Sequence, residues 1–453
     1  MRTTDVDMLY GKLLKKLLLF TLPIALSSIV QQLFNAADTA VVGHFSNANA
    51  LAAVGTNTET IALIVTVSSG LSIGVNVLIA NLIGCKESQH IPMAVQTAVL
   101  LSILFWLAGL FFGQAVAAPL LRLIRTPEHI FHSAKLYLRI YLLGYPFLLL
   151  YDFGSAILRA RGDSRYPFLA LVVSGAANIG LNLFFVIVFH MGVSGVALAT
   201  DVSNGLSAFL VLIRLKKDGQ FLLRFQKSHG LLHFIGEILK TGIPLAVQGA
   251  VFCLANIFVQ ASVNRFGATA IAGSTIAMNF EYVTYYIITA FGQTATTFTS
   301  QNYAAKQYAR CRTILWCSLL LSAVCSSIPI FSIVLFRNTV SGFFSTDAAV
   351  IETAGIRILC ILLFEPICNL YEIPAGVLRG SGHAICPAVS TMIGTCAFRT
   401  LWICTAFRAY PSLPMLYHAF PLSWVATILL VNMGGAIIAY LGKRKRANWI
   451  GDK

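Results

Sequence analysis

Long apolar stretches follow one another along the whole chain and are separated by short polar segments. Each stretch is about 20 residues or longer, the length that an α-helix needs to cross the hydrocarbon core of a bilayer. The pattern therefore predicts an all-α, multi-pass membrane protein with twelve transmembrane helices. The predicted spans lie at approximately residues 14–42, 51–81, 92–118, 132–157, 167–189, 193–215, 235–263, 270–300, 311–336, 351–377, 385–408 and 417–441.

The two halves of the chain repeat each other at an offset of about 220 residues. The segment LLYDFGSAILRARGDSRYP (149–167) matches NLYEIPAGVLRGSGHAICP (369–387), so that Asp152 corresponds to Glu372 and Arg159 to Arg379. Because six spans is an even number, both copies enter the membrane from the same side, which predicts parallel repeats related by an axis along the membrane normal. We expect an N-terminal six-helix bundle (1–215), a cytoplasmic linker (216–234) and a C-terminal six-helix bundle (235–453).

Composition supports this class, and the distribution of charge sets the orientation. Hydrophobic residues make up 57% of the chain and charged residues only 11%, against about 25% charged in soluble domains. With the N-terminus placed in the cytoplasm, 23 of the 32 Lys and Arg residues fall on the inner side of the membrane. This positive-inside pattern predicts a cell (cytoplasmic) membrane protein with both termini in the cytoplasm. The net charge of +15 therefore reflects topology and does not indicate a nucleic-acid partner.

Duplicated six-span halves are typical of transporters, in which two similar bundles rock about a shared cleft. An ion channel would more often show a selectivity-filter loop, and no TVGYG-like loop is present. An intramembrane enzyme would need a nucleophile with its base, or a zinc motif such as HExxH, inside a span. HExxH does not occur, and the histidines lie mostly at span ends. The ten cysteines are scattered without a CxxC pair. We therefore expect a transporter and not an enzyme, with no metal or disulfide role for the cysteines.

Several segments together resemble the multidrug and toxic compound extrusion (MATE) family. They are ADTAVVGHFSNANALAAVG (37–55), the paired links LRARGDSRYP (158–167) and LRGSGHAICP (378–387), FGQTATTFTSQNYAAKQ (291–307), and the early prolines of the first and seventh spans. The resemblance covers nearly the whole chain. It implies two six-helix bundles around a V-shaped central cleft, and a monomer without a bound cofactor. It also implies a secondary antiporter that exports small organic cations or amphiphiles (multidrug efflux) through the lipid bilayer in exchange for H⁺ or Na⁺, by alternating access.

Two departures from the family pattern bear on the branch and on the coupling ion. Family members often carry a second Asp where this chain has Asn182, which removes one negative charge and weakens the case for tight Na⁺ binding. Where the NorM-type branch carries the acids of a sodium site, this chain has Phe252 and Cys368. The chain therefore looks closer to the DinF-type branch, although Glu365, one turn from Cys368, keeps the alternative open.

Asp38 lies inside the first span, near its outer end, and a charged residue at the centre of a transmembrane helix costs about 2.5–3.5 kcal/mol on insertion scales. The resemblance implies a cation-coupling site formed by Asp38 with Asn178, Asn182, Thr200 and Tyr141, which could hold H⁺, or Na⁺ through the first four residues. Depth along the helices agrees, because Asp38 lies about 6 Å, and Asn182 and Thr200 about 10 Å, from the outer ends of their spans. The alternative is that Asp38 only hydrogen-bonds a neighbouring helix.

Other polar residues inside spans are candidates for the substrate cleft. Glu281 lies beside aromatic residues and could bind a lipophilic cation through charge and ring quadrupoles, or it could be a hydrogen-bonded structural acid. Further candidates for the cleft are Gln31, Tyr282 and Gln293.

The gate is expected at the inner side. Asp152 and Glu372 occupy equivalent positions in the two halves, seven residues before Arg159 and Arg379, and the symmetric pair favours a structural role there. Pro23 removes a backbone hydrogen bond and makes the first span the natural place to bend.

Two alternative functions stay open. A lipid-linked sugar flippase of the same superfamily would favour a strongly basic cleft with several arginines inside spans, whereas Arg399 is the one arginine that clearly falls inside a predicted span. An ion channel would conduct its substrate without exchanging it for a second ion.

Overall fold

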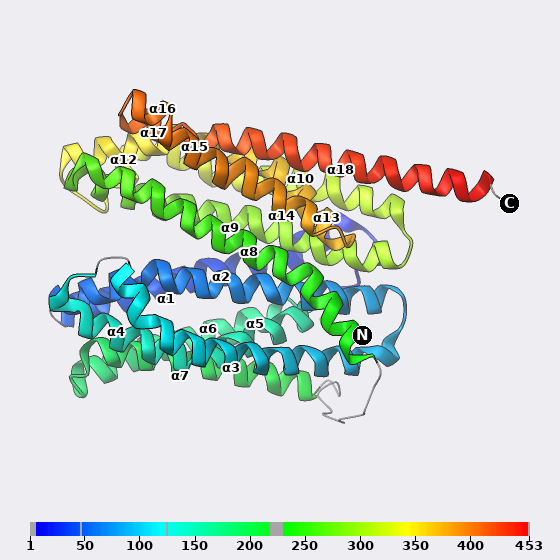
Figure 1. Ribbon diagram of the computed structural model, residues 1–453, viewed down its shortest axis with the longest axis horizontal. Coiled ribbons are helices and arrows are strands. Elements are labelled where there is room, and N and C mark those ends of the chain that lie inside the picture. The colour runs from blue at the N-terminus through cyan, green and yellow to red at the C-terminus, as the bar shows by residue number, and fades with distance from the viewer. Residues whose placement is uncertain (1–5, 46–47, 124–125, 218–229, 452–453) are drawn as a thin grey trace. The chain divides into compact units, whose positions relative to one another are not determined.

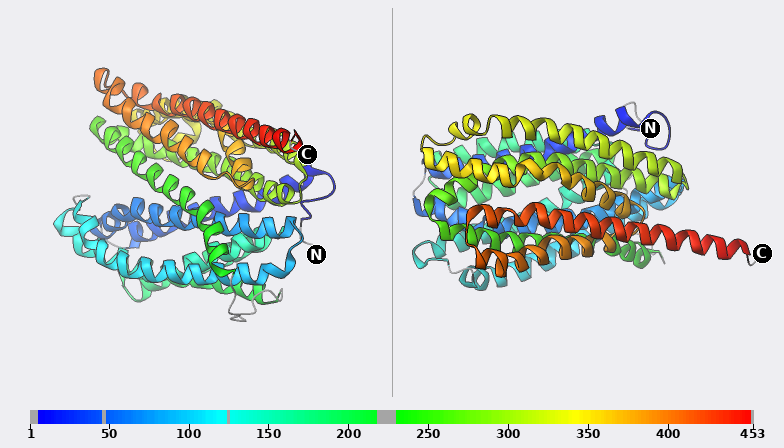
Figure 2. Two further views of the ribbon diagram at one scale, coloured as in Figure 1. Left: turned by 45° about the vertical axis from the view of Figure 1, so that its right-hand side comes forward. Right: turned by 90° about the horizontal axis from the view of Figure 1, so that it is seen from above.

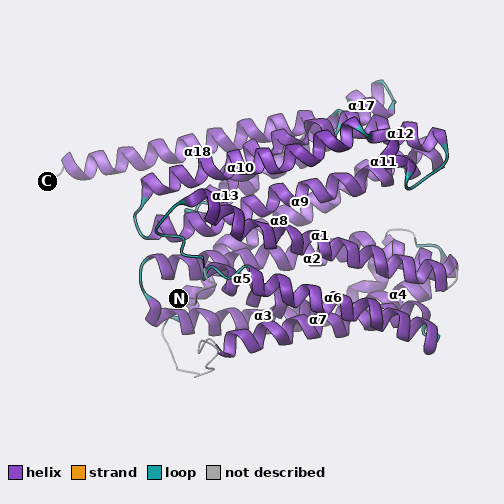
Figure 3. Ribbon diagram, turned by 180° about the vertical axis from the view of Figure 1, so that it is seen from behind, coloured by secondary structure: helices purple, strands orange, loops and turns teal. Residues whose placement is uncertain are grey.

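The computed structural model describes residues 6–45, 48–123, 126–217 and 230–451, with the side chains of residues 48, 51, 59, 123 and 441–451 left undescribed. Throughout these ranges the chain is helical, with short connecting loops and no strand (Figure 3). The prediction of an all-α protein is confirmed.

The first half of the chain forms seven helices. They are α1 (Leu13–Phe45), α2 (Ala48–Gly84), α3 (Ile91–Leu123), α4 (Glu128–Leu143), α5 (Tyr145–Ala160), α6 (Arg165–Leu183), which continues as a π-helical segment (Phe184–Val188), and α7 (Gly192–Lys217).

The second half repeats this order with more interruptions. Its elements are α8 (Leu231–Val263), α9 (Ala268–Ala304), α10 (Tyr308–Leu335), α11 (Arg337–Gly342), α12 (Ala348–Cys360), a 3₁₀ segment (Leu362–Cys368), α13 (Asn369–Gly380), α14 (Ile385–Thr391), a π-helical segment (Met392–Ala397), α15 (Phe398–Cys404), α16 (Ala406–Ala409), α17 (Leu413–Tyr417) and α18 (Ala419–Gly451).

Each of the twelve predicted spans coincides with a helix or with a short run of consecutive helices. Among the described residues, eight helices are individually long and apolar enough to cross a membrane. The α4–α5 pair, which bends by 43°, makes a ninth if it forms one span. The predicted spans 270–300, 351–377 and 385–408 correspond to the polar-rich α9 and to the two interrupted stretches that contain α12–α13 and α14–α15.

The internal repeat extends from the sequence to the backbone. Helices α2 and α9 each have 37 residues, and both their first and last residues are 220 positions apart. The residues that leave these two helices, Lys86 and Lys306, both have a positive φ, of 61° and 60°. Gly162 and Gly382, just after α5 and α13, also share a positive φ. A left-handed residue at the end of a helix stops it and turns the chain, so the two halves end their helices by the same device.

Contacts divide the chain into two compact units at a different point from the predicted linker. The first unit comprises Met1–Met8 and Leu19–Ala246, and the second comprises Leu9–Leu18 and Val247–Lys453. The boundary thus lies inside α8, because the first part of that helix packs on α2. Gly70 and Gly74 of α2 lack the Cβ atoms that would collide with the backbone at Ala246 and Ile238. Residues 218–229 of the predicted linker 216–234 lie outside the described residues.

In the first unit, α2, α4, α5, α6 and α7 pack along one another (Figure 1). Two buried amides on α2 tie it to its neighbours across the apolar core. Asn57 donates to the carbonyl of Ala134 on α4 at 3.0 Å, and Asn76 donates to the carbonyl of Ala156 on α5 at 3.0 Å. Because the hydrocarbon region offers no water, these bonds satisfy polar groups that would otherwise cost several kcal/mol each.

In the second unit, α9 is central and packs against α10, α12 and α13 (Figure 2). Glycine allows the closest approach, since a Cβ on Gly376 or Gly380 of α13 would collide with backbone carbonyls of α9. On the α10 side, the Asn369 amide of α13 donates to Ser326 Oγ at 3.1 Å and accepts a hydrogen bond from Ser322.

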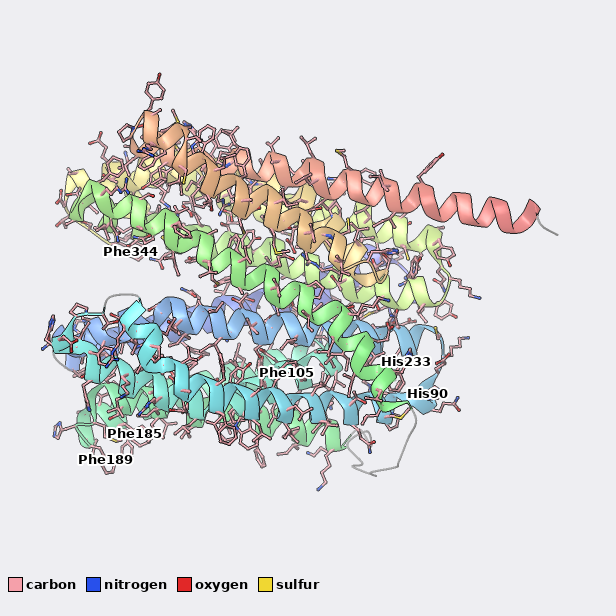
Figure 4. All side chains as sticks on the ribbon, viewed as in Figure 1. His90, Phe105, Phe185, Phe189, His233 and Phe344 are labelled. Carbon is pink, nitrogen blue, oxygen red and sulfur yellow. The ribbon has the colours of Figure 1, made fainter. Side chains whose placement is uncertain are left out.

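Large apolar side chains also cover the outside of the helices, as expected for surfaces that face lipid. Phe111 and Phe112 on α3 are each 72% exposed. Phe185 and Phe189 belong to an aromatic group at the end of the α6 segment, and Phe344 lies just beyond α11 (Figure 4). Exposed aromatic residues at helix ends are typical of the boundary between hydrocarbon and water.

The bend between α4 and α5 generates a test of packing. A Cβ on Gly144 would overlap the carboxylate of Asp201 on α7, whereas a Cβ on Gly180 of α6 would meet nothing within 4 Å. We expect Gly144→Ala to destabilise the protein by about 1–3 kcal/mol through overpacking, and Gly180→Ala to leave it unchanged. Melting temperatures of the two variants in detergent check this. An unchanged melting temperature for Gly144→Ala would show that the bend is not held by this contact.

Candidate functional site

Asp38 lies in the second half of α1 and is buried, with 6% of its side chain exposed. One carboxylate oxygen accepts a hydrogen bond from Asn182 Nδ2 on α6, and the other accepts one from Thr200 Oγ1 on α7 at 3.1 Å. Asn182 Nδ2 also donates to Asn178 Oδ1 at 3.1 Å. The structure thus brings together four of the residues expected in a coupling site. We call Asp38, Asn178, Asn182 and Thr200 the Asp38 site.

Local sequence explains how three helices converge there. Asn178 and Asn182 are four residues apart and therefore share one face of α6. Gly175, one turn earlier on α6, leaves room for the ring of Phe34 on α1, which a Cβ at that position would overlap. The Thr200 hydroxyl also lies 3.0 Å from the carbonyl of Val196 in its own helix, which is a second acceptor for its single proton.

The hydrogen-bond partners of the Asp38 carboxylate are all neutral. Among the described residues, no Lys, Arg or His forms an ion pair with Asp38. The side-chain oxygen of Asn182 is buried and has no hydrogen-bond partner, so the amide that donates to Asp38 also carries an unused acceptor. A buried carboxylate without a basic partner is stabilised by taking up a proton or a small cation. The site is chemically suited to bind either.

Tyr141, the fifth residue predicted for this site, stands slightly apart. It is buried on α4 and stacks on Tyr137, with ring centroids 6.5 Å apart. Both rings lie within electrostatic range of Asp38, but no hydrogen bond joins Tyr141 to Asp38 in the part of the chain that the structure describes. Asp201, next to Thr200, is also buried and turns toward Gly144 on the α4–α5 bend.

Glu281 has a partner that lies far from it in the sequence. Arg357 on α12 donates to both of its carboxylate oxygens, at 2.7 and 2.9 Å, and both side chains are largely buried. The expectation that Arg399 is the one arginine clearly inside a span is therefore incomplete. Arg357 lies 76 residues from Glu281, and no local pattern marks the pair. Their charges cancel, so Glu281 does not present a free negative charge to a cationic substrate.

A pocket in the second unit surrounds this ion pair. It is formed wholly by residues of the second unit. Glu365, which the sequence analysis left open as a possible site residue, is buried at its wall and accepts a hydrogen bond from Thr284 Oγ1 on α9 at 2.6 Å. We call this the C-terminal pocket. Its lining residues are Phe252, Asn256, Val259, Gln260, Met278, Glu281, Tyr282, Tyr285, Arg357, Ile361, Glu365, Tyr371, Arg399, Phe420 and Trp424.

The other cleft candidates are half-buried and lie in different units. Gln31 is on α1 in the first unit, and Gln293 is on α9 in the second. Tyr282, also on α9, lines the C-terminal pocket and stacks on Tyr286 with ring centroids 6.4 Å apart. Pro23 lies inside α1, which is helical from Leu13 to Phe45.

The two predicted gate acids have different partners. Glu372 and Arg379 form a buried ion pair at 2.9 Å. In the first half, Asp152 instead accepts a hydrogen bond from Ser68 Oγ at 2.8 Å, and Arg159 acts on it only through longer-range attraction. The symmetry seen in the sequence therefore holds for the positions of the acids but not for their partners.

One segment matches an enzyme motif by spacing alone. GLSIG (70–74) has the GxSxG pattern of hydrolase nucleophiles, but Ser72 lies inside α2 and donates to the carbonyl of Ser69 at 2.8 Å. Its two glycines are used for packing against α8. The segment is not on the strand-to-helix turn that this chemistry requires.

Comparison with known proteins decides the family. The MatE family model matches residues 23–184 and 244–401, which are the corresponding parts of the two halves. The chain belongs to the MatE family. It is therefore a multi-pass membrane transporter rather than an enzyme, as the sequence predicts.

Curated relatives span most of the chain. The chain is 25% identical over 427 residues to the probable multidrug resistance protein YoeA of Bacillus subtilis, covering 91% of each chain. It is 28% identical over 397 residues to the probable multidrug resistance protein NorM of Thermotoga maritima, covering 84% of this chain and 82% of that one. It is also 25% identical over 368 residues to a FAD transporter of Shewanella oneidensis, covering 76% and 79%. These names do not separate the DinF-type from the NorM-type branch.

Solved structures confirm the fold. A crystal structure of a MATE protein in the bent conformation superposes with a TM-score of 0.88 at 21% identity, covering 98% of this chain and 99% of that one. An outward-facing multidrug resistance MATE family transporter of the MOP superfamily gives a TM-score of 0.88 at 22% identity, covering 98% and 100%. The expected twelve-helix transporter fold is thus confirmed.

The buried Glu281–Arg357 pair generates a test by double substitution. Removing one partner leaves an uncompensated buried charge, so we expect Glu281→Gln or Arg357→Met alone to cost about 3–5 kcal/mol of stability. The double variant should cost less than the sum of the two, as measured by unfolding in detergent. The exposed pair of Lys240 and Glu237, 3.9 Å apart, serves as control, and Glu237→Gln should have little effect. If the losses of stability in the two single variants simply add up in the double variant, the two side chains do not stabilise each other.

Proposed function

We propose that this transporter is a secondary antiporter that exports amphiphilic organic compounds, with a preference for cations, across the cell membrane. Export is driven by inward movement of H⁺, with Na⁺ as the alternative coupling ion, and Asp38 is the coupling group. Transport proceeds by alternating access of a cleft between two six-helix bundles. The protein works as a monomer, and both termini lie in the cytoplasm.

The observation that carries this proposal is the Asp38 carboxylate, which is buried and has only neutral hydrogen-bond partners. A structural acid inside a membrane is usually paired with a base, as Glu281 is with Arg357. Asp38 lacks such a partner, so its charge depends on a proton or an ion taken from solution. This dependence is what a coupling group requires.

The contacts of Asp38 suggest how loading the ion changes the protein. An ionised carboxylate accepts hydrogen bonds at both oxygens, and Asn182 and Thr200 supply one each. A protonated carboxylic acid must donate through one of those oxygens. Protonation would therefore break or reverse one contact to α6 or α7, and the unused oxygen of Asn182 is available to accept the new donor after the amide turns. Pro23 lies on the same helix as Asp38 and is the proposed point of bending in α1.

The choice between H⁺ and Na⁺ follows from the oxygens in the site. The Asp38 site contains a single carboxylate, two amides and one hydroxyl. A proton needs one carboxylate and one acceptor, and both are present. Na⁺ would need several oxygens arranged around it, with only one formal negative charge among them. The donor set favours H⁺.

The substrate class rests on the relatives and on the distribution of charge. Two curated relatives are named as probable multidrug resistance proteins, which supports export of varied organic compounds. Because Arg357 neutralises Glu281, we assign the preference for cations to Asp38, whose charge alternates. A relative named as a FAD transporter indicates that the family also handles anionic aromatic compounds. A lipid-linked sugar flippase has less support. The C-terminal pocket contains two buried arginines, and only one of them, Arg399, lacks a paired acid.

Coupling is tested by substituting the titrating group. In everted membrane vesicles we expect Asp38→Asn to abolish efflux of a cationic dye driven by a pH gradient, because the amide cannot gain or lose a proton. Thr200→Ala, Asn178→Ala and Asn182→Ala should reduce efflux only partly, since each removes a dipole. The exposed Glu352→Gln on α12 is the matched control and should transport normally.

The same vesicles separate the competing proposals. Efflux that is driven by an imposed Na⁺ gradient and not by a pH gradient would identify Na⁺ as the coupling ion instead of H⁺. Wild-type rates in Asp38→Asn under a pH gradient would show that Asp38 is not the coupling group. Flux that continues without either gradient and without exchange would indicate a channel.

Orientation has its own test, which follows from the asymmetry of Lys and Arg. Tags placed at the two ends of the chain should be accessible to protease or to a membrane-impermeant label only in everted vesicles. Tags that react from outside intact cells would contradict the cytoplasmic placement of that terminus and the even number of spans.

A further inference from the structure

Arg399, on α15, is a fully buried cation with an incomplete set of partners. It is 1% exposed, and its Nε donates to Ser423 Oγ on α18 at 3.0 Å. Its Nη1 is buried and has no hydrogen-bond partner. The guanidinium carbon lies 4.0 Å from the ring centroid of Phe420 and 5.7 Å from that of Phe252. An arginine has five N–H donors in a rigid fork, so these contacts leave donors available.

No acid in the described part of the chain forms an ion pair with Arg399. The nearby charges have other partners, because Arg357 and Glu281 bind each other and Glu365 accepts from Thr284. The faces of Phe420 and Phe252 offset part of the cost of burial through cation–π attraction, but a ring cannot accept the N–H of Nη1 in the plane of the fork. A buried, uncompensated guanidinium is therefore suited to an anion.

Arg399 lines the C-terminal pocket, whose walls suit a flat ring system. Phe252, Phe420, Trp424 and Tyr285 contribute aromatic surface to the same pocket. Largely apolar walls with a small number of placed polar groups are the usual arrangement for binding an organic molecule in a fixed orientation.

We propose that the C-terminal pocket binds an aromatic ligand through an anionic group, a carboxylate or a phosphate monoester, with Arg399 as its counter-charge. The guanidinium fork matches both groups, because each offers two oxygens to parallel N–H donors. The aromatic walls then hold the ring. This site is distinct from the Asp38 site and does not depend on the coupling proposed for it.

Glu365 lines the same pocket and sets the orientation of the ligand. Its carboxyl group offers no positive charge to an anion, so the anionic group lies on the Arg399 side and the ring occupies the space between. Glu365→Gln should therefore leave the affinity for an anion unchanged or increase it. A site for organic cations would behave in the opposite way, since Glu365→Gln would weaken the binding of a cation and Arg399 would oppose it.

The first experiment uses the wild-type chain in lipid nanodiscs and three matched probes. Calorimetric titrations with 2-naphthoate, 2-naphthyl phosphate and the uncharged 2-naphthylmethanol are corrected with empty nanodiscs. We expect at least one of the anions to bind about tenfold or more tightly than the alcohol, the effect of a hydrogen bond to a charged group. The stronger of the two anions identifies the group that the site prefers. Equal binding of alcohol and anions, or no binding of either anion, would overturn the proposal.

The second experiment assigns the preference to Arg399. Arg399→Gln should abolish the tighter binding of the anion relative to the alcohol. Arg408 is an exposed arginine on α16, and Arg408→Gln should retain this difference in affinity. Phe252→Glu retains Arg399 and places a carboxylate of the protein beside it. This variant should weaken the binding of the anion about tenfold or more. Because it leaves Arg399 in place, Phe252→Glu decides the question if Arg399→Gln does not fold. A folded Arg399→Gln or Phe252→Glu that retains the wild-type preference would overturn the proposal.

Binding in nanodiscs needs no ion gradient, so this result is separable from the coupling test. Asp38→Asn should bind the naphthyl anion like the wild type even if it has lost transport. Loss of anion binding in Asp38→Asn would overturn the independence of the two sites.

Discussion

Hydrogen bonds to the Asp38 carboxylate hold three helices of the first unit at one point. Asn182 on α6 and Thr200 on α7 donate to its two oxygens. In the hydrocarbon region there is no water to replace a lost partner, so each of these bonds must be made within the protein. The charge of Asp38 decides how many acceptors it offers. We therefore propose that the contact between α1 and its neighbours depends on whether the carboxylate is charged, so that the gain or loss of one proton changes the packing of these helices.

The second unit uses the same order of helices but satisfies its buried charges differently. Glu281 binds Arg357 with both oxygens, and Glu372 binds Arg379. In the first half the residue equivalent to Glu372 is Asp152, and its partner is the neutral hydroxyl of Ser68. The positive-φ residues after corresponding helices lie in the same register in both halves. The halves have thus kept the backbone device that ends each helix, while the partners of their buried acids have diverged.

The sequence predicted the features that depend on local pattern. Apolar length located the helices, and the repeat located the paired links 158–167 and 378–387, which contain Gly162 and Gly382. The group of Asp38, Asn182 and Thr200 was predicted because residues at similar depth on neighbouring spans can meet, and a family pattern indicated which spans are neighbours.

Features that depend on long-range packing were not predictable in this way. Arg357 and Glu281 are 76 residues apart, and each alone resembles an ordinary polar residue in a span. The unit boundary inside α8 arises from two glycines on α2 that admit a distant backbone, which no composition change marks. The helices of the later spans are interrupted, but the sequence stays apolar across each interruption. The apolar pattern therefore does not mark these breaks.

Size and charge separate the two sites chemically. At the Asp38 site the side chains bond directly to one another, and the carboxylate is suited to a proton or a small ion. The C-terminal pocket has aromatic walls and a buried arginine, Arg399, without a paired acid. A carboxylate without a base is suited to a mobile positive ion, and an arginine without an acid is suited to a negative group on a larger molecule. The ligands that we propose for these two charges therefore differ in both sign and size, with a small cation at Asp38 and an anionic organic molecule at Arg399.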